Sequence, residues 1–560
     1  MGKMVNSVGG VLIDYEFYPG EDLYSDGSIE NTIYDAIVMN EESKILHSSN
    51  EWAVLYHLSD IRENIIEWCN IDRNSKVLEI GSGCGAVTSV LSNKAKSVDC
   101  VELSQRRTLI NAERNKNKNN IKIYLGNFQD VEKKLGQYDV ITLIGVLEYA
   151  GLYIHGKHPY TNLLRIVKKH LSNKGKIIIA IENKIGLKYL NGAPEDHMGQ
   201  PYVGINDYVG CHDVRTFSGN ELREMLKEVG LLKCNFYYPV PDYKLPMKIY
   251  SQDILPKPGD IRTYKTNYSK TRIYNFMEDV ANDQISSDGM FEYMSNSFLI
   301  IAGKEFEEDV LFAKYNRERK CEYRISTKIT NTEDGVRVVK SALTEEAFSH
   351  IKRIKENEEN WVPANNMLKK GCGFIKEGKY YSGYIKGKTL VEILYKYRND
   401  SDEFIKSVDE LINKYYQPDK DNLIQFEKTT SFTEVFGDIY VENSMSYRIT
   451  NIDLLFSNII IDDTGNAYAI DFEWVFDFPI PYRFVSWRAC KELYCVYMAY
   501  YKNFLSIDEY YAKLGFKDFE VIAFKQMEKN FGDYVCGFNR NEEYLHNYVK
   551  PFITPKMIIG

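Results

Sequence analysis

The sequence lacks the marks of membrane, exported and zinc-binding proteins. No stretch approaches the ~20 apolar residues that a transmembrane helix requires. The segment from Met1 to Tyr18 has no cationic start and no apolar middle, so we expect no signal peptide. The ten cysteines include no Cys-X-X-Cys pair, and cysteines scattered in this way predict neither a zinc site nor a disulfide framework. We therefore expect a cytoplasmic location.

An excess of positive charge is also missing. The chain has 70 Lys and Arg residues against 79 Asp and Glu residues, which gives a net charge of -9. A general grip on nucleic acid needs a basic surface that displaces counterions from phosphates, so we expect no nucleic-acid partner. The length of 560 residues exceeds the ~250–300 residues at which one core stops growing, and it predicts two large domains.

The first half alternates apolar strands with amphipathic helices. Strands are expected at 76–80, 97–102, 121–125, 138–144, 176–182 and 232–238, and helices at 86–93, 106–116, 163–170 and 221–229. This alternation predicts an α/β fold, a doubly wound, Rossmann-like parallel sheet with helices on both faces. Prolines interrupt 239–294, which we interpret as an irregular insertion before a last strand at 297–304. The expected units are an N-terminal extension at 1–50 and this domain at 51–305.

The pattern changes after a charged run at 304–309. Strand-like runs at 310–315, 322–329 and 336–340 precede a helix at 344–359, and further strand-like residues at 374–385 lead into mostly helical sequence. A small sheet-rich lobe followed by a helical lobe is typical of a kinase. Residues 310–560 are therefore predicted to form a second, α+β bilobal kinase-like domain.

A glycine-rich turn follows the first expected strand. Gly81, Gly83 and Gly85 alternate in VLEIGSGCG, and glycines let backbone N–H groups approach a ligand where a Cβ would block it. Glu102 ends the next strand, where a carboxylate can accept hydrogen bonds from both ribose hydroxyls. Glu79 precedes the turn, and an acid there suits the cationic aminoacyl end of S-adenosylmethionine and repels a pyrophosphate. A purely structural turn or a dinucleotide site is the alternative.

Much of residues 52–250 resembles bacterial methyltransferases that accompany glycosyltransferases in cell-surface polysaccharide clusters. The resemblance runs through YHLSDIRENIIEW, VLEIGSGCGAVT, GNFQD, DVITLIGVLEYAGLY, AIENKIGLKYLNGAPEDHMGQ and PVPDYKLP. It implies a class I fold that binds S-adenosylmethionine, with the glycine turn near the methionine part and Glu102 on the ribose. It also implies that Asn127 and Phe128 grip the adenine, with the amide oxygen of Asn127 accepting from the amino group. Gly145 would form the floor of the pocket.

Methyl transfer from a sulfonium needs in-line positioning and, for a hydroxyl acceptor, a base. Asp196 and His197 lie in a loop after the fifth strand, at the strand ends where such sheets place their ligands. We predict His197 as the base and Asp196 as the carboxylate that orients it. A packing role for His197 is the alternative, and His155 or His158 could then supply the base.

Three side chains that kinase chemistry requires occur in order in the second half. Asp453 and Asn458 lie five residues apart, and Asp471 follows thirteen residues later after an apolar run. These residue types match the catalytic Asp and the two metal ligands of kinases, and Lys340 in a VVK strand matches the lysine that meets the phosphates. The region resembles the kinase-like and aminoglycoside-phosphotransferase-like superfamily. The resemblance implies ATP with Mg²⁺.

Other positions depart from the kinase pattern. The phosphate-loop segment at 316–320 contains no glycine, Asn451 stands in place of the usual His, and Glu473 in place of the usual Gly. Glu356 has the better spacing for the helix glutamate that pairs with Lys340. An active kinase, a pseudokinase and a chance resemblance all stay open.

Together these features predict a cytoplasmic methyltransferase that uses S-adenosylmethionine on a sugar or sugar-linked acceptor during surface-polysaccharide assembly. The kinase-like half would phosphorylate the same acceptor, and glycosyltransferases of the pathway are the expected partners. Two alternatives stay open. The C-terminal half could be a non-catalytic docking module, and the methyl acceptor could be a small metabolite or a peptide.

Overall fold

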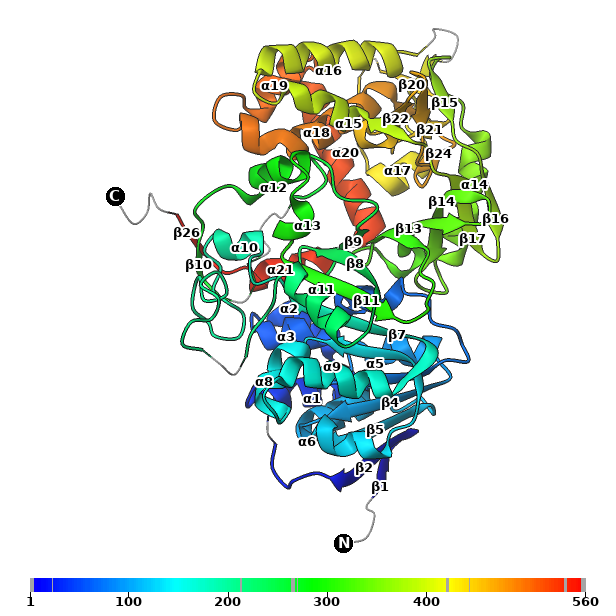
Figure 1. Ribbon diagram of the computed structural model, residues 1–560. Coiled ribbons are helices and arrows are strands. Elements are labelled where there is room, and N and C mark those ends of the chain that lie inside the picture. The colour runs from blue at the N-terminus through cyan, green and yellow to red at the C-terminus, as the bar shows by residue number, and fades with distance from the viewer. Residues whose placement is uncertain are drawn as a thin grey trace.

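The computed structural model describes residues 5–22, 24–211, 214–262, 267–268, 270–418, 423–442, 444–537 and 541–554. Figure 1 shows the N-terminal half, coloured blue to green, below the C-terminal half, coloured green to red. A mixed sheet of 15 strands extends through both halves.

Nine strands of this sheet belong to the N-terminal half. In spatial order they are β1 (Val5–Val8), β2 (Val11–Phe17), β5 (Ile121–Gly126), β4 (Ser97–Glu102), β3 (Lys76–Ile80), β6 (Tyr138–Ile144), β7 (Leu171–Glu182), β11 (Ser297–Gly303) and β8 (Lys233–Val240). Strands β2 to β7 run parallel, and β11 lies antiparallel between β7 and β8. The chain turns to opposite sides of β3 to form β4 and β6, and ligands bind at such a switch point.

Helices cover both faces of this part of the sheet (Figure 1). They include α1 (Ile29–Met39), α2 (Glu42–Ser48), α3 (Trp52–Leu58), α5 (Thr88–Lys94), α6 (Gln105–Arg114), α9 (Pro159–Lys169) and α11 (Gly219–Glu228). The local sequence sets their starts. Ser104 caps α6, Ser218 and Glu221 form a capping box at α11, and Pro159 opens α9.

Two expected segments are less separate than the sequence suggested. The 1–50 extension supplies β1 and β2, and β2 pairs with β5 at the sheet edge. Within the expected irregular insertion at 239–294, the residues Lys248–Ser251 form β9, which pairs with β8 on one side and β12 on the other. The prolines that suggested irregular structure flank this short strand and do not interrupt it.

The sheet continues into the C-terminal half through β9. Its remaining strands are β12 (Val310–Tyr315), β13 (Ile325–Thr332), β14 (Gly335–Ala342), β17 (Lys379–Gly383) and β16 (Gly373–Lys376), all antiparallel to their neighbours. Helix α14 (Phe348–Asn360) contacts β14, β16 and β17. A sheet with one helix therefore precedes the helical part, in the expected order.

The helical part packs around α18. Its helices are α15 (Leu390–Leu394), α16 (Ser401–Tyr415), α17 (Thr430–Phe436), α18 (Tyr482–Tyr501), α19 (Ile507–Lys513) and α20 (Asp518–Cys536). Trp487, Tyr497 and Tyr501 of α18 are fully buried in a core rich in aromatic residues. The short strands β22 (Ile459–Asp462) and β23 (Ala467–Ala469) lie between the two predicted metal ligands in sequence.

Helices from each half also contact the other half. Helix α21 (Asn541–Tyr548), near the end of the chain, packs on α2, and its Tyr544 hydroxyl lies 3.0 Å from the hydroxyl of Ser59. Helix α12 (Glu278–Ser287) packs on α18, where the Tyr500 hydroxyl donates to Asp283. Within the described ranges, no helix is long and apolar enough to cross a membrane.

Candidate active site

A cavity of about 510 Å³ opens at the carboxyl ends of β3, β4 and β6. It contains most of the predicted cofactor and acceptor residues of the first half, namely Glu79, Gly81, Gly83, Glu102, Asn127, Phe128, Gly145, Asp196 and His197. Gly85 supports the turn from behind and is not in the lining. The strand-end location is the one that the switch-point argument predicts.

The glycine turn requires glycine for two physical reasons. Gly81 and Gly85 have φ of 73° and 78°, a region that other residues rarely adopt. A Cβ on Gly81 would also lie 2.5 Å from a methyl carbon of Val146, and one on Gly85 would lie 2.4 Å from Oδ1 of Asn111. The turn is therefore held close to the end of β6 and to α6.

Glu102 holds the glycine turn against the end of β4. Its Oε2 accepts from the Gly83 N–H at 2.7 Å, and its Oε1 accepts from the N–H groups of Leu103 and Ser104 at 2.8 and 3.0 Å. The carboxylate is buried and lines the cavity, so it lies where the sequence predicts the ribose contact.

Glu79 lies deeper, on β3. It is buried, and it accepts a hydrogen bond of 2.6 Å from the Thr88 hydroxyl. Burial raises the pKa of Glu79 to about 7, because a low-dielectric surrounding disfavours the charged carboxylate. A cationic ligand group beside it would favour ionisation.

Asn127 and Phe128 lie together at the end of β5, in the cavity wall. The amide of Asn127 is already engaged, because Oδ1 accepts from the Gln129 N–H and Nδ2 donates to the Tyr153 carbonyl, each at 3.0 Å. Asn127 thereby caps the short helix α7 (Phe128–Val131). An amide oxygen can accept a second hydrogen bond, so the contact of Oδ1 with adenine stays a prediction.

The segment before α1 lies over the cavity, which sequence reasoning missed. Asp26 accepts from Arg107 at 2.7 Å and contacts Nε2 of His57 at 2.8 Å. The Tyr24 hydroxyl lies 3.1 Å from the Tyr149 hydroxyl. All five side chains line the cavity. His57 could be proposed from its helix upstream of the glycine turn, whereas only pairing across the fold reveals the roles of Tyr24 and Asp26.

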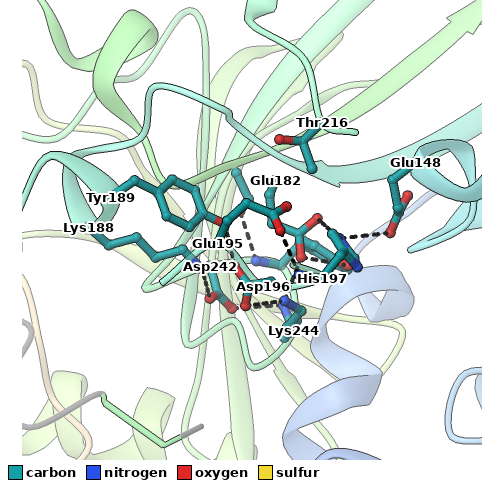
Figure 2. Close-up of polar contacts among 12 residues, drawn as sticks. Glu148, Glu182, Lys188, Tyr189, Glu195, Asp196, His197, Thr216, Asp242 and Lys244 are labelled. Atoms are coloured by element: carbon teal, nitrogen blue, oxygen red, sulfur yellow. Dashed lines mark hydrogen bonds and ion pairs between the residues drawn. The ribbon is translucent and has the colours of Figure 1, made fainter. Parts of the chain in front are cut away.

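His197 has different partners from those predicted (Figure 2). Its Nδ1 lies 2.9 Å from the Tyr149 hydroxyl, and its Nε2 lies 3.5 Å from Glu182 and 3.9 Å from Glu148. Asp196 does not orient the ring, because its carboxylate is engaged by Lys244, Lys188 and the hydroxyl of Tyr189. The predicted Asp196–His197 pair is therefore wrong as a contact.

Charge around His197 also opposes the base role. Burial would lower the pKa of His197, but the carboxylates of Glu182 and Glu148 outweigh it and raise the pKa to about 9. An imidazole that already holds a proton at neutral pH cannot accept another. The base role stays a prediction that requires this proton to leave first.

Glu148 and Glu182 are functional candidates that sequence reasoning missed. Glu148 lies in η3 (Leu147–Tyr149) directly after β6, and Glu182 ends β7. Burial, reinforced by Glu182, raises the pKa of Glu148 to about 8. Burial opposes ionisation of Glu182 as well, but Lys244 and His197 hold the pKa of Glu182 below its usual range. The feature of the sequence that could have identified Glu148 and Glu182 is that each lies at or just after the end of an expected strand.

The rival histidines lie elsewhere. His155 and His158 are exposed, and neither is among the residues that line the cavity. The loop between α8 (Ala150–Tyr153) and α9 carries both of them on its outer side.

The second half brings the predicted lysine and metal ligand together. Nζ of Lys340 lies 2.7 Å from Asp471 and 2.5 Å from Glu473. These carboxylates outweigh burial and keep the pKa of Lys340 above its ordinary value. Arg319 contacts the other oxygen of Glu473 at 2.6 Å, so a basic side chain of the glycine-free segment reaches the same group.

Asp453 and Asn458 lie in the same cluster. The side-chain amide of Asn458 donates to the Asp453 carbonyl at 2.9 Å, and Arg488 contacts the Asp453 carboxylate at 3.0 Å. Burial raises the pKa of Asp453 to about 6 against the effect of Arg488, and the nearby charge of Asp471 adds to this increase. Glu356 is exposed on α14, so the expected partnership with Lys340 is replaced by Glu473.

Curated relatives match only part of the chain. A ribosomal RNA small subunit methyltransferase A from Mesomycoplasma hyopneumoniae is 34% identical over 130 residues, which are 22% of this chain and 44% of that protein. The same enzyme from Syntrophus aciditrophicus is 28% identical over 121 residues, covering 22% of this chain and 41% of its own length. The chain thus spans less than half the length of these relatives.

Solved structures match part of the chain at low identity. A SAM-dependent methyltransferase from Archaeoglobus fulgidus has 13% identity and a TM-score of 0.27, covering 49% of this chain and 98% of its own. A Haemonchus contortus phosphoethanolamine N-methyltransferase 1, solved with phosphoethanolamine and S-adenosylhomocysteine, has 16% identity and a TM-score of 0.26, covering 40% and 48%.

The family assignment depends on one segment. Residues 53–232 match the model of a family described as a methyltransferase domain. This segment includes the glycine turn, Glu102 and His197, and it supplies strands β3 to β7 of the doubly wound sheet. Over residues 53–232 the chain is therefore similar to methyltransferase domains, and these residues form most of the parallel part of the sheet.

Proposed function

We propose that the protein transfers a methyl group from S-adenosylmethionine to a hydroxyl of a sugar or sugar-linked group during bacterial surface-polysaccharide assembly, in the cytoplasm. One observation carries the proposal. The cavity that contains the cofactor turn also contains Glu148, Asp196 and His197. Carboxylates and imidazoles hydrogen-bond sugar hydroxyls well, so the acceptor side of the cavity fits a polyhydroxylated molecule.

The curated relatives suggest RNA as another acceptor. Their matches cover 22% of this chain, and the net charge of -9 opposes the counterion release that RNA binding requires. The charge argues against RNA only, and a glycan, or a glycosyltransferase that presents one, stays the proposed partner. A small metabolite or a peptide is compatible with the same cavity.

For the second half we propose phosphoryl transfer to the same acceptor, with ATP and Mg²⁺. The gathering of Lys340, Asp453, Asn458 and Asp471 supports it, because these groups hold phosphates, metal and the attacking hydroxyl in kinases. The second candidate is a non-catalytic docking module. The two ion pairs of Lys340 and the glycine-free segment at 316–320 favour that candidate.

Methyl transfer is tested with labelled S-adenosylmethionine. Glycan precursors and ribosomal RNA from a strain that lacks the gene are offered separately to the purified full-length protein. We expect label in the glycan fraction, identified by mass spectrometry, and much less label with the Glu102→Ala variant at the same cofactor concentration. Label in the RNA alone would overturn the choice of acceptor, and label in neither fraction would favour a metabolite or peptide.

A further inference from the structure

We propose that Glu148, Glu182 and His197 bind a divalent metal ion inside the methyltransferase cavity. One ligand atom from each residue lies within 4.8 Å of the others. The three residues come from η3, from the end of β7 and from the loop that follows it. Their separation in sequence means that the fold, and no local motif, assembles the set.

The ligand atoms are buried without hydrogen-bond partners. Both carboxylate oxygens of Glu148, Oε2 of Glu182 and Nε2 of His197 have none, although these side chains are at most 9% exposed. Buried polar atoms are nearly always satisfied, and an unpaired buried carboxylate is costly. Oε2 of Glu182 and Nε2 of His197 face one another at 3.5 Å, and the convergence of such atoms from all three residues indicates a ligand.

Neighbouring groups orient these atoms. Nδ1–H of His197 can donate to the hydroxyl oxygen of Tyr149 at 2.9 Å, and this tautomer leaves the lone pair of Nε2 for a metal. Lys244 pairs with Oε1 of Glu182 at 2.5 Å, which leaves Oε2 directed toward Nε2 of His197, 3.5 Å away. Outer partners of this kind fix the tautomer and direction of metal ligands, so the cluster resembles a supported metal centre.

Local charge also favours a cation. The ion pairs around His197 leave the carboxylates in excess over the lysines (Figure 2). The carboxylates are those of Glu148, Glu182, Glu195, Asp196 and Asp242, and the cations are Lys188, Lys244 and, when protonated, His197. A divalent ion would offset this excess.

Two carboxylate oxygens and one imidazole nitrogen suit Mn²⁺ or a similar ion, and three protein ligands leave positions open. This step rests on the proposed function. We infer that the oxygen of the acceptor hydroxyl binds the metal at an open coordination position. Coordination lowers the pKa of the acceptor hydroxyl, whose proton passes to water. The oxygen then bonds to the methyl carbon as the carbon–sulfur bond breaks, which leaves S-adenosylhomocysteine. His197 would act as a ligand in place of the predicted base role.

Mn²⁺ binding tests the site apart from any acceptor. The full-length protein is treated with a chelator, desalted and titrated with Mn²⁺ by calorimetry and by electron paramagnetic resonance. We expect one ion per chain, with competition from Mg²⁺ or Zn²⁺. Glu148→Gln and His197→Ala should each weaken Mn²⁺ binding by at least about 100-fold, since even outer-shell changes cost 10–100-fold.

Matched controls separate the ligands from their surroundings. Asp402→Asn removes an exposed carboxylate on α16, and His158→Ala removes an exposed imidazole, so both should keep the wild-type affinity for Mn²⁺. S-adenosylhomocysteine titrated into the same samples reports whether the cofactor site is intact. Wild-type protein that binds S-adenosylhomocysteine and no divalent ion would overturn the metal site and leave the proposed function standing. Equal losses in all four variants would also overturn it.

Discussion

Glu102 is the residue on which the cofactor assignment depends most directly. Its carboxylate joins the glycine turn to the end of β4, so Glu102→Ala removes the ribose acceptor and loosens the turn. We expect S-adenosylhomocysteine to bind about 1.5–3 kcal/mol more weakly, as measured by calorimetry. Glu113→Ala on α6, where Glu113 pairs with Lys116, is the control and should bind normally. An unchanged affinity for Glu102→Ala would remove the ribose assignment.

Glu79 gives a pH-dependent prediction at the same scale. Its folded pKa of about 7 lies above its ordinary value of 4.5, so the unfolded chain releases this proton first as the pH rises. The contribution of protonated Glu79 to the free energy of unfolding is therefore fully present below pH 4.5 and is lost between pH 4.5 and 7. Glu79→Gln cannot ionise, and its free energy of unfolding should rise relative to wild type by up to about 3 kcal/mol across that range. Urea unfolding at pH 5 and pH 8 measures the change, and a difference independent of pH would contradict it.

Some site residues could be predicted from the sequence, and others could not. The glycine turn and Glu102 were predictable because a strand, a turn and the next strand fix their places locally. Glu148 follows a predicted strand and Glu182 ends one, but nothing in the local sequence says that their oxygens converge on His197. Asp196 was paired with His197 because the two are adjacent, yet the fold brings lysines from other segments to Asp196. Contacts between distant segments decide side-chain partners.

At the scale of elements, α21 links the end of the described chain to the methyltransferase half. Tyr548 is fully buried, and its hydroxyl donates to the Leu46 carbonyl at 3.0 Å. Tyr548→Ala should cost about 3–5 kcal/mol through the cavity that it leaves. Tyr548→Phe keeps the ring and should cost about 0.5–1.5 kcal/mol. Chemical denaturation followed through the N-terminal half tests both values, and an unaffected N-terminal half would show that α21 does not stabilise it.

The elements themselves were predicted better than their pairing. Alternating strands and helices indicated the parallel part of the sheet, because each strand has an apolar run of its own. Strand β9 has four residues between proline-rich segments and carries little periodic signal. Its pairing with β12 across the expected boundary at 304–309 involves residues about sixty positions apart in the printed sequence. The continuous sheet was therefore invisible to local patterns.

For the whole molecule, the shared sheet and the packing of α12 and α21 couple the two halves. A ligand that binds only the folded state stabilises a protein by mass action. Ligands of either half should therefore raise the melting temperature of a chain that unfolds as one unit. If the two halves unfold independently, the melting curve should show two transitions, and S-adenosylhomocysteine and a nucleotide should each shift only one of them.

Nucleotide binding distinguishes the two candidate functions of the second half. ATP with Mg²⁺ should raise the melting temperature of wild type, because Asp471 and Asn458 can supply oxygen ligands to Mg²⁺ and Lys340 can meet the phosphates. Asp471→Ala should abolish the Mg²⁺-dependent part of the increase. Asp453→Ala should keep the increase but stop phosphoryl transfer, since the proposed role of Asp453 is to orient and deprotonate the acceptor hydroxyl. Differential scanning fluorimetry and transfer of labelled phosphate measure the two effects. If no nucleoside triphosphate raises the melting temperature of the wild-type protein, the docking-module candidate is favoured. The proposal that one acceptor receives both a methyl group and a phosphate would then be wrong. The methyltransferase half would keep its own tests, because none of these variants touches its cavity.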